Sequence, residues 1–239
     1  MKNRTLVDCI LAVVMVGNMN AKFEEKLNSK KYLVRERLAN FLGRRKNITE
    51  APGILVRLLN DKSSFVRSEA LNSLMKIGSK KYFSKVLPLL DDKNYVVKID
   101  AIECIARLGK KRALKHLLKH LKDKNGIVRM YVGTVIGEIG DKTCAGYLEK
   151  RLKIEHSSHA KVGLLDGLYR LGQKERLLGL IHLLKSRNYR VRCAVANTFA
   201  SLINKRNQSL IKESLLNALK NEATVAARSS MEGALKNIN

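Results

Sequence analysis

The chain has little proline, no tryptophan and no recognisable enzyme motif. Only Pro52 and Pro88 interrupt the helical periodicity of its 239 residues, and strand signals are absent. The sequence contains no P-loop, no glycine-rich dinucleotide turn and no Ser-His-Asp signature. An apolar content of 45% with regular periodicity excludes a disordered chain. These features favour a folded, all-α protein.

Acidic residues are scarce as well. The 21 Asp and Glu residues stand against 47 Lys and Arg residues, which gives a formal net charge of +26 and a pI near 10.1. Such an excess is extreme for a folded domain without a basic tail. By composition alone, it predicts attraction to polyanions and nothing more specific.

Cysteine is rare, and its spacing does not suggest a metal site. Cys9, Cys104, Cys144 and Cys193 lie among apolar helical neighbours without CxxC spacing. This pattern is typical of buried structural thiols in a reducing compartment. We therefore expect a cytoplasmic protein with no bound metal and no cofactor.

What the chain does have is an internal repeat. A Val-Arg or Val-Lys pair recurs at nearly fixed spacing, and an apolar-Gly pair closes the helical segment that follows it. The pairs are Val34-Arg35, Val66-Arg67, Val97-Lys98, Val128-Arg129, the degenerate Ala160-Lys161, and Val191-Arg192. The closing pairs are Leu42-Gly43, Ile77-Gly78, Leu108-Gly109, Ile139-Gly140 and Leu171-Gly172, with Ile203-Asn204 in the sixth unit. We expect a left-handed stop at these Gly and Asn residues.

Each unit is predicted to be a helix, a tight turn, a second helix and a short loop. Helices this short are marginal alone in water, so neighbouring units must stack and share one buried face. We predict one continuous solenoid of about seven helical pairs, with six repeats over residues 28–219 and a C-terminal capping helix over 220–239. Residues 1–27 fit a capping half-repeat better than a signal peptide, and their apolar run is too short to span a membrane.

The repeat resembles the short HEAT repeat of the phycobilin-lyase type. The pattern that carries the resemblance is a loop Asp, Val-Arg six residues later, and a closing Gly, seen as Asp61…Val66-Arg67…Gly78, Asp92…Val97-Lys98…Gly109 and Asp123…Val128-Arg129…Gly140. The resemblance implies a right-handed α-α superhelix whose second helices line a concave binding surface. It also implies that the Arg after Val pairs with the loop Asp and with neighbouring carbonyl groups. The resemblance is a weak indicator of function, because such repeats occur in scaffolds, lyase subunits, hydroxylases and glycosylases alike.

Basic residues recur in three columns along the repeat. The first is a structural ladder with the loop acids, comprising Asp61 with Arg67, Asp92 with Lys98, and Asp123 with Arg129. The second column follows each helix stop, where the helix dipole alone accounts for a cation. Its members are Arg45, Lys80, Lys111, Lys142, Lys174 and Arg206.

The third column lies at the ends of the second helices, and we predict that it binds a polyanion. The alternative is a solvated, lysine-rich helix face. The predicted polyanion-binding residues are Lys115, Lys119, Lys122, Lys150, Lys153, His182, Lys185, Arg129 and Arg192. Tyr32, Tyr95 and Tyr189 precede ladder cations by three residues, where a ring can stack on bases or staple the helix entrance.

The sequence offers no catalytic, cofactor-binding or metal-binding residues. None of the five histidines is followed by Glu, which the iron-binding hydroxylases of this repeat class require. His116 and His120 share a helix face but lack a nearby carboxylate or thiolate ligand. Asp166 near Tyr169 imitates the catalytic Asp of HEAT-like DNA glycosylases, but the tryptophans of that pocket are missing.

We therefore expect a non-enzymatic scaffold that binds DNA or RNA through lysine–phosphate contacts. The alternatives are an adaptor for an acidic partner protein and, more weakly, a lyase subunit or glycosylase-like enzyme. No small-molecule substrate and no membrane partner are predicted, and the oligomeric state is left open.

Overall fold

The computed structural model describes residues 21–45 and 48–238, and in these ranges all regular secondary structure is α-helix or 3-10 helix. The all-α prediction is confirmed. The chain divides between Leu108 and Gly109 into an N-terminal and a C-terminal unit. A short helix covers residues 21–27, and the rest of the predicted capping half-repeat lies outside the described residues.

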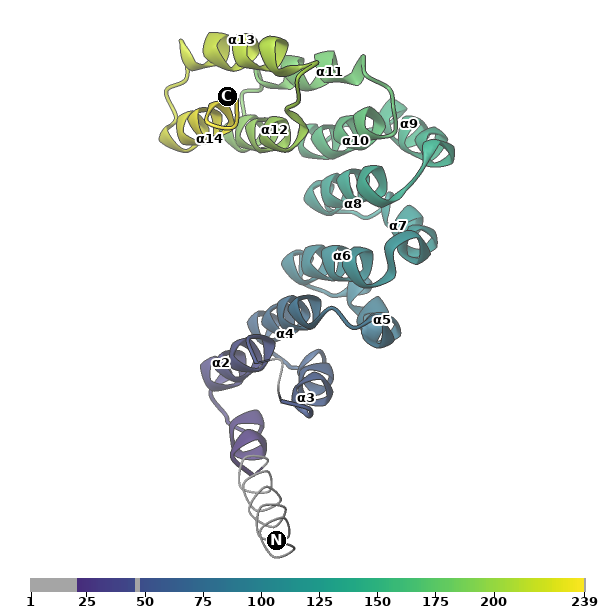
Figure 1. The fold of residues 1–239 in the computed structure, drawn as a ribbon, viewed down its shortest axis with the longest axis vertical. Helices are drawn as coiled ribbons and strands as arrows, with labels where there is room; N and C mark the ends of the chain where they lie inside the picture. The colour runs from purple at the N-terminus through teal and green to yellow at the C-terminus, as the bar shows by residue number, and fades with distance from the viewer. Residues whose placement is uncertain (1–20, 46–47, 239) are drawn as a thin grey trace, which may run out of the picture. The chain divides into compact units, whose positions relative to one another are not determined.

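The N-terminal unit alternates Val-Arg helices with shorter second helices (Figure 1). Its elements are α2 (Tyr32–Gly43), α3 (Ala51–Leu58), α4 (Ser64–Ile77), η1 (Lys80–Tyr82), α5 (Phe83–Val86), η2 (Leu87–Asp91) and α6 (Tyr95–Gly109). Helix α2 packs on α4, and α3 packs against both. Leu42, Val66 and Leu74 are fully buried between them. Pro88 lies at the start of η2, where its missing N–H fits the change from α-helix to 3-10 helix.

The C-terminal unit continues the alternation in two rows of helices (Figure 1). Its elements are η3 (Lys110–Ala113), α7 (Leu114–His120), α8 (Gly126–Ile139), η4 (Lys142–Cys144), α9 (Ala145–Lys153), α10 (Ser158–Arg170), α11 (Arg176–Leu183), α12 (Tyr189–Leu202), α13 (Gln208–Leu219) and α14 (Val225–Leu235). The first helices of the repeats, α8, α10, α12 and α14, form one row, and each packs on the next. We call them the Val-Arg helices, although α10 carries Ala160-Lys161 and α14 carries Ala227-Arg228 at that position. The second helices α7, α9, α11 and α13 form the other row.

Four glycines bring α8 and α10 unusually close. A Cβ added to Gly163 would lie 1.9 Å from the carbonyl oxygen of Met130, and one added to Gly137 would lie 2.4 Å from the Cα of Gly167. A Cβ on Gly133 would lie 2.8 Å from the carbonyl carbon of Gly163. The two backbones therefore touch directly, which only glycine permits. This contact makes α8 and α10 the most closely packed helix pair of the unit.

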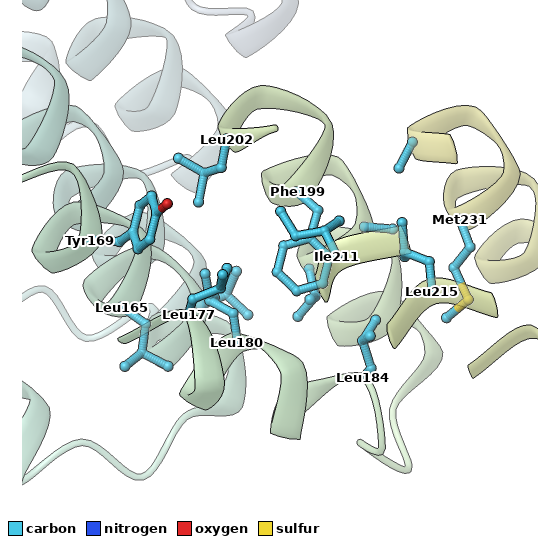
Figure 2. Close-up of a cluster of buried hydrophobic side chains, with 14 of the residues drawn as sticks. Leu165, Tyr169, Leu177, Leu180, Leu184, Phe199, Leu202, Ile211, Leu215 and Met231 are labelled. Atoms are coloured by element: carbon cyan, nitrogen blue, oxygen red, sulfur yellow. The ribbon is translucent and has the colours of Figure 1, made fainter. Parts of the chain in front are cut away.

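A continuous apolar core holds the end of the C-terminal unit together. Figure 2 shows Phe199 of α12 beside Ile211 of α13, and both side chains are fully buried. The same cluster takes in Tyr169 of α10, Leu180 of α11 and Met231 of α14. Each helix thus buries its apolar face only against its neighbours, as the repeat period predicts.

The helix stops differ from the prediction. Gly78 and Gly172 do adopt positive φ angles, of 74° and 113°. Gly109 does not, and the left-handed residue there is Lys110 with a φ of 48°. Gly43 is the last residue of α2, Gly140 is extended, and Asn204 is not left-handed. The apolar-Gly pair marks where a helix ends but not which residue turns the chain.

The cysteines of the described ranges behave as small apolar side chains. Cys104 and Cys144 are buried and Cys193 is half-buried, and all three are free thiols. Burial, followed by the charge of Asp100, raises the pKa of Cys104 to about 12. Cys9 lies outside the described residues.

Candidate polyanion-binding surface

The predicted ladder connects each repeat to the next one. On α4, the guanidinium of Arg67 donates from Nε and Nη2 to the two carboxylate oxygens of Asp92, at 2.7 and 2.8 Å. Its Nη1 donates to the backbone carbonyl of Asp61 at 2.7 Å. We predicted that Arg67 would pair with the carboxylate of Asp61. That carboxylate instead accepts from Arg35 of the preceding repeat. Each ladder arginine therefore pairs with the loop acid of the next repeat and not with that of its own.

The same arrangement recurs in the C-terminal unit. Arg129 donates to both carboxylate oxygens of Glu155, each at 2.7 Å, and to the carbonyl of Asp123 at 2.6 Å. Arg192 donates to both oxygens of Glu222 at 2.6 and 2.7 Å. In the N-terminal unit, Lys98 on α6 has the equivalent position in the sequence and is half-buried. The ladder thus joins successive repeats through paired, charge-assisted hydrogen bonds.

Arg129 and Arg192 must be removed from the predicted binding residues. The side chains of Arg129 and Arg192 are only 9% and 16% exposed, and all three guanidinium nitrogens of each already donate hydrogen bonds. A ligand phosphate would have to displace a buried carboxylate, which would leave an unpaired charge in the interior. Both arginines are structural.

The ladder also shifts the pKa values of its acids. Burial opposes ionisation of Glu155, but hydrogen bonds from Arg129, the Ser157 N–H and Arg151 outweigh it and lower the pKa to about 2. The hydrogen bond from Arg192 is the main cause that lowers the pKa of Glu222 to about 2. Both acids are therefore charged at neutral pH and belong to the fold. Neither acid was predicted from the sequence, although each lies six residues before a ladder position, at Lys161 and Arg228.

The remaining predicted binding residues all lie in the C-terminal unit and are exposed. We call them the second-helix cations: Lys115 and Lys119 on α7, Lys122 after it, Lys150 and Lys153 on α9, His182 on α11, and Lys185 after it. None of these lysines forms an ion pair with any described residue. They differ in this from the ladder arginines, and their ammonium groups are free to meet a ligand.

Positive charge is densest around α7. Residues 110–122 carry six Lys and Arg residues and two histidines without one acid. Desolvation lowers the pKa of His116, and the nearby charges of Lys115, Lys119 and His120 lower it further. The cations of α7 therefore add to the effect of burial on His116.

The second-helix cations do not line an inner surface of the C-terminal unit, which corrects the expectation of a concave site. Close packing between successive repeats runs through α8, α10, α12 and α14. Among the described residues, α7, α9, α11 and α13 have no comparable packing with one another. The closer spacing puts the Val-Arg row on the inner side of this unit and the second helices on the outer side (Figure 1). The glycine contacts between α8 and α10 explain why the inner row is so tight.

The second column and the tyrosines make local contacts. Lys111 pairs with Asp141 at 3.4 Å, and Lys174 donates to the carbonyl of Tyr169 at 3.1 Å. Tyr32 stacks on Phe65 with ring centroids 5.7 Å apart, which fits a hydrophobic contact at the helix entrance. These contacts account for Lys111, Lys174 and Tyr32 without a ligand.

No catalytic centre emerges around Asp166. Its side chain is almost fully buried and accepts a hydrogen bond from Arg170 at 2.8 Å. Burial raises the pKa of Asp166, and Arg170 opposes that rise. A carboxylate in this position is closed to a substrate. No group of three or more His, Cys, Asp or Glu residues suited to a metal ion exists within residues 21–45 and 48–238. In the same ranges, no helix is both long and apolar enough to cross a bilayer.

Paired helices that share buried faces with their neighbours define an α-helical repeat protein. The family model described as HEAT repeats matches residues 20–103 and 83–163, which together exceed half of the chain. The chain therefore belongs to the HEAT-repeat family.

Solved structures show the same fold at low sequence identity. The complex of CpcE and CpcF of phycocyanin lyase from Nostoc sp. PCC7120 is 17% identical with a TM-score of 0.63, and the match covers 90% of this chain and 92% of that chain. YibA of Escherichia coli is 23% identical with a TM-score of 0.52, over 90% of this chain and 80% of that one. At this identity the likeness concerns the fold alone. A search of curated protein sequences found no significant match.

Proposed function

We propose that this HEAT-repeat protein is a non-enzymatic scaffold that binds nucleic acid through the second-helix cations of its C-terminal unit. The observation that carries the proposal is the division of the basic residues into two groups. Ladder arginines are buried or half-buried and paired with carboxylates, whereas Lys119, Lys150 and Lys185 are exposed and unpaired. These lysines contribute to the net charge of +26, and carboxylates of the described residues do not neutralise them.

The repeat gives these cations a regular arrangement along the chain. Lys119 and Lys122 at the end of α7 recur as Lys150 and Lys153 at the end of α9. A polymer with a repeating charge can engage several such positions at once, and each contact releases counterions. Lysine provides affinity for phosphate with little base recognition, so we expect weak sequence preference.

The salt dependence of binding tests the proposal. A 20-base-pair duplex and a single strand of equal length are titrated by fluorescence anisotropy at several salt concentrations. Lys119→Glu with Lys150→Glu should weaken binding at least tenfold and reduce the log–log salt slope by about 2, since each lost phosphate contact contributes roughly 0.9. The melting temperature should stay nearly unchanged, because both side chains are exposed and unpaired.

A matched control changes the same charge elsewhere. Lys205→Glu with Lys236→Glu also removes two exposed lysines of the C-terminal unit, but these lie outside the second-helix cations. This variant should keep most of the affinity and the salt slope. Equal weakening by both variants would show a diffuse charge effect and reject the proposed surface. Absence of binding even at low salt would reject nucleic acid as the ligand.

An adaptor for an acidic protein is the competing function. Polyglutamate of matched charge, titrated under the same conditions, separates the two. If polyglutamate binds and neither oligonucleotide does, the ligand of the second-helix cations is an acidic protein and not nucleic acid.

A further inference from the structure

The ladder has a gap between the last repeats. The residue six positions before each ladder cation contributes the loop side chain of the ladder, and this residue is acidic at most positions. The series is Ser29, Asp61, Asp92, Asp123, Glu155, Ser186 and Glu222. Within the C-terminal unit, Ser186 interrupts the acids, and the cation one repeat earlier is Lys161. Lys161 stands where Arg129 and Arg192 stand in their repeats, but the expected carboxylate is missing.

The backbone around Ser186 keeps the geometry of the other loops. The Asn188 N–H donates to Ser186 Oγ at 3.3 Å, as the Ser157 N–H donates to Glu155 at 2.8 Å. Arg192 donates to the carbonyl of Ser186 at 2.7 Å, as Arg129 does to Asp123. The loop is therefore intact, and only the anion that would face Lys161 is absent.

Lys161 and Ser186 line one open depression, together with His182, Lys185 and Arg187. No carboxylate lines it. Lys161 is half-buried on α10 and forms no ion pair with the described residues. The ladder acids on either side of Ser186 in the series, Glu155 and Glu222, are already bound by Arg129 and Arg192. Several cations thus line the depression at the position where other repeats have a carboxylate and this one has Ser186.

We propose that this depression, the Lys161 site, binds a phosphate group that replaces the missing ladder carboxylate. A phosphate carries more charge and more acceptor oxygens than a carboxylate, so it can accept from Lys161, Lys185 and Arg187 together. The Ser186 hydroxyl accepts from the Asn188 N–H and keeps its own proton to donate. The inference deepens the proposed function if the phosphate belongs to nucleic acid, but it requires only a phosphate group.

Pyrophosphate binding by the wild type and by variants of Ser186 and Lys161 tests the Lys161 site. Wild-type protein is titrated with inorganic pyrophosphate by isothermal calorimetry at constant ionic strength, and one site per chain is expected. Ser186→Glu supplies the carboxylate found at most of the other loop positions, so it should raise the melting temperature and weaken pyrophosphate binding at least tenfold. Lys161→Gln should weaken binding to a similar degree without raising the melting temperature. Lys236→Gln, which removes an exposed lysine elsewhere, should bind like the wild type.

The source of the phosphate is settled by a second titration. If Lys161→Gln weakens the binding of an oligonucleotide as much as that of pyrophosphate, the Lys161 site holds a phosphate of the nucleic acid. If Lys161→Gln affects only pyrophosphate, the Lys161 site serves a small phosphorylated ligand, and nucleic-acid binding by the second-helix cations is judged by its own test. If oligonucleotides do not bind at all, the proposed function fails while the Lys161 site stands. The Lys161 site is overturned if wild-type protein does not bind pyrophosphate, or if Lys161→Gln and Ser186→Glu bind it as tightly as Lys236→Gln.

Discussion

Arg129 and Glu155 form a two-pronged salt bridge between successive repeats, with both N–O distances at 2.7 Å. Their side chains are 9% and 1% exposed. Glu155 also accepts from Arg151 of its own repeat and from the Ser157 N–H, so its two oxygens serve four donors. This carboxylate fixes both the loop of its repeat and the distance to the previous one.

Glu155→Gln should therefore destabilise the C-terminal unit. The neutral amide leaves Arg129 buried without its counter-charge, and breaking a buried pair costs about 3 kcal/mol. Urea unfolding followed by circular dichroism should show a lower midpoint, and Glu213→Gln, at an exposed position on α13, should change it little. Equal midpoints for the two variants would contradict a structural role of the ladder.

The same group predicts how stability depends on pH. The folded-state pKa of Glu155 is about 2, against an ordinary value of 4.5 for the unfolded chain. A lowered pKa means that the stabilisation is fully present above pH 4.5 and is lost as the pH falls towards 2. The difference in free energy of unfolding between wild type and Glu155→Gln should therefore be largest near pH 7. It should shrink by about 1–3 kcal/mol on acidification to pH 2.5. A difference that is constant over this range would show that Glu155 does not ionise as described.

The sequence was sufficient for the repeat but not for the contacts between repeats. The period from Val66 to Val97 to Val128 predicts the helices correctly, because each Val is buried at the same place in its unit. The same period led us to pair each loop Asp with the cation of its own repeat, and only stacking shows that the salt bridge joins different repeats. Ladder arginines also cannot be told from ligand-binding ones by spacing, since both recur with the repeat. Whether Lys119 and Lys150 bind a polyanion stays a prediction.

The inner and outer layers were also beyond the sequence analysis, although a signal was available. Gly133 and Gly137 in one repeat match Gly163 and Gly167 in the next, each pair four residues apart on one helix face. Two such pairs in consecutive repeats indicate helices in backbone contact. That contact places the Val-Arg helices on the inside of the C-terminal unit. The second helices, and the second-helix cations they carry, therefore lie on the outside.

Gly163→Ala tests this contact. The new Cβ would lie 1.9 Å from the carbonyl oxygen of Met130, so α8 and α10 must separate, and overpacking of this kind costs about 1–3 kcal/mol. Gly233→Ala in α14 is the matched control, because nothing lies within 4 Å of its Cβ position. There, alanine should stabilise the helix by about 0.5–1 kcal/mol. Thermal unfolding should move in opposite directions for the two variants, and a stabilised Gly163→Ala protein would contradict the observed packing.

His116 links the proposed binding to pH. Its pKa is lowered by desolvation and by the charges of Lys115, Lys119 and His120, so in the free protein it loses its proton below its ordinary value of 6.5. A lowered histidine pKa also means that the free protein loses some stability as the pH falls below 6.5.

Phosphates bound near Lys115 and Lys119 would offset the positive potential and raise the pKa of His116. Binding should therefore take up protons, and affinity for an oligonucleotide should increase as the pH falls from 7.5 to 5.5. Calorimetry in two buffers of different ionisation enthalpy measures this uptake, which His116→Gln should reduce. Unchanged proton uptake in His116→Gln would place the bound nucleic acid away from α7.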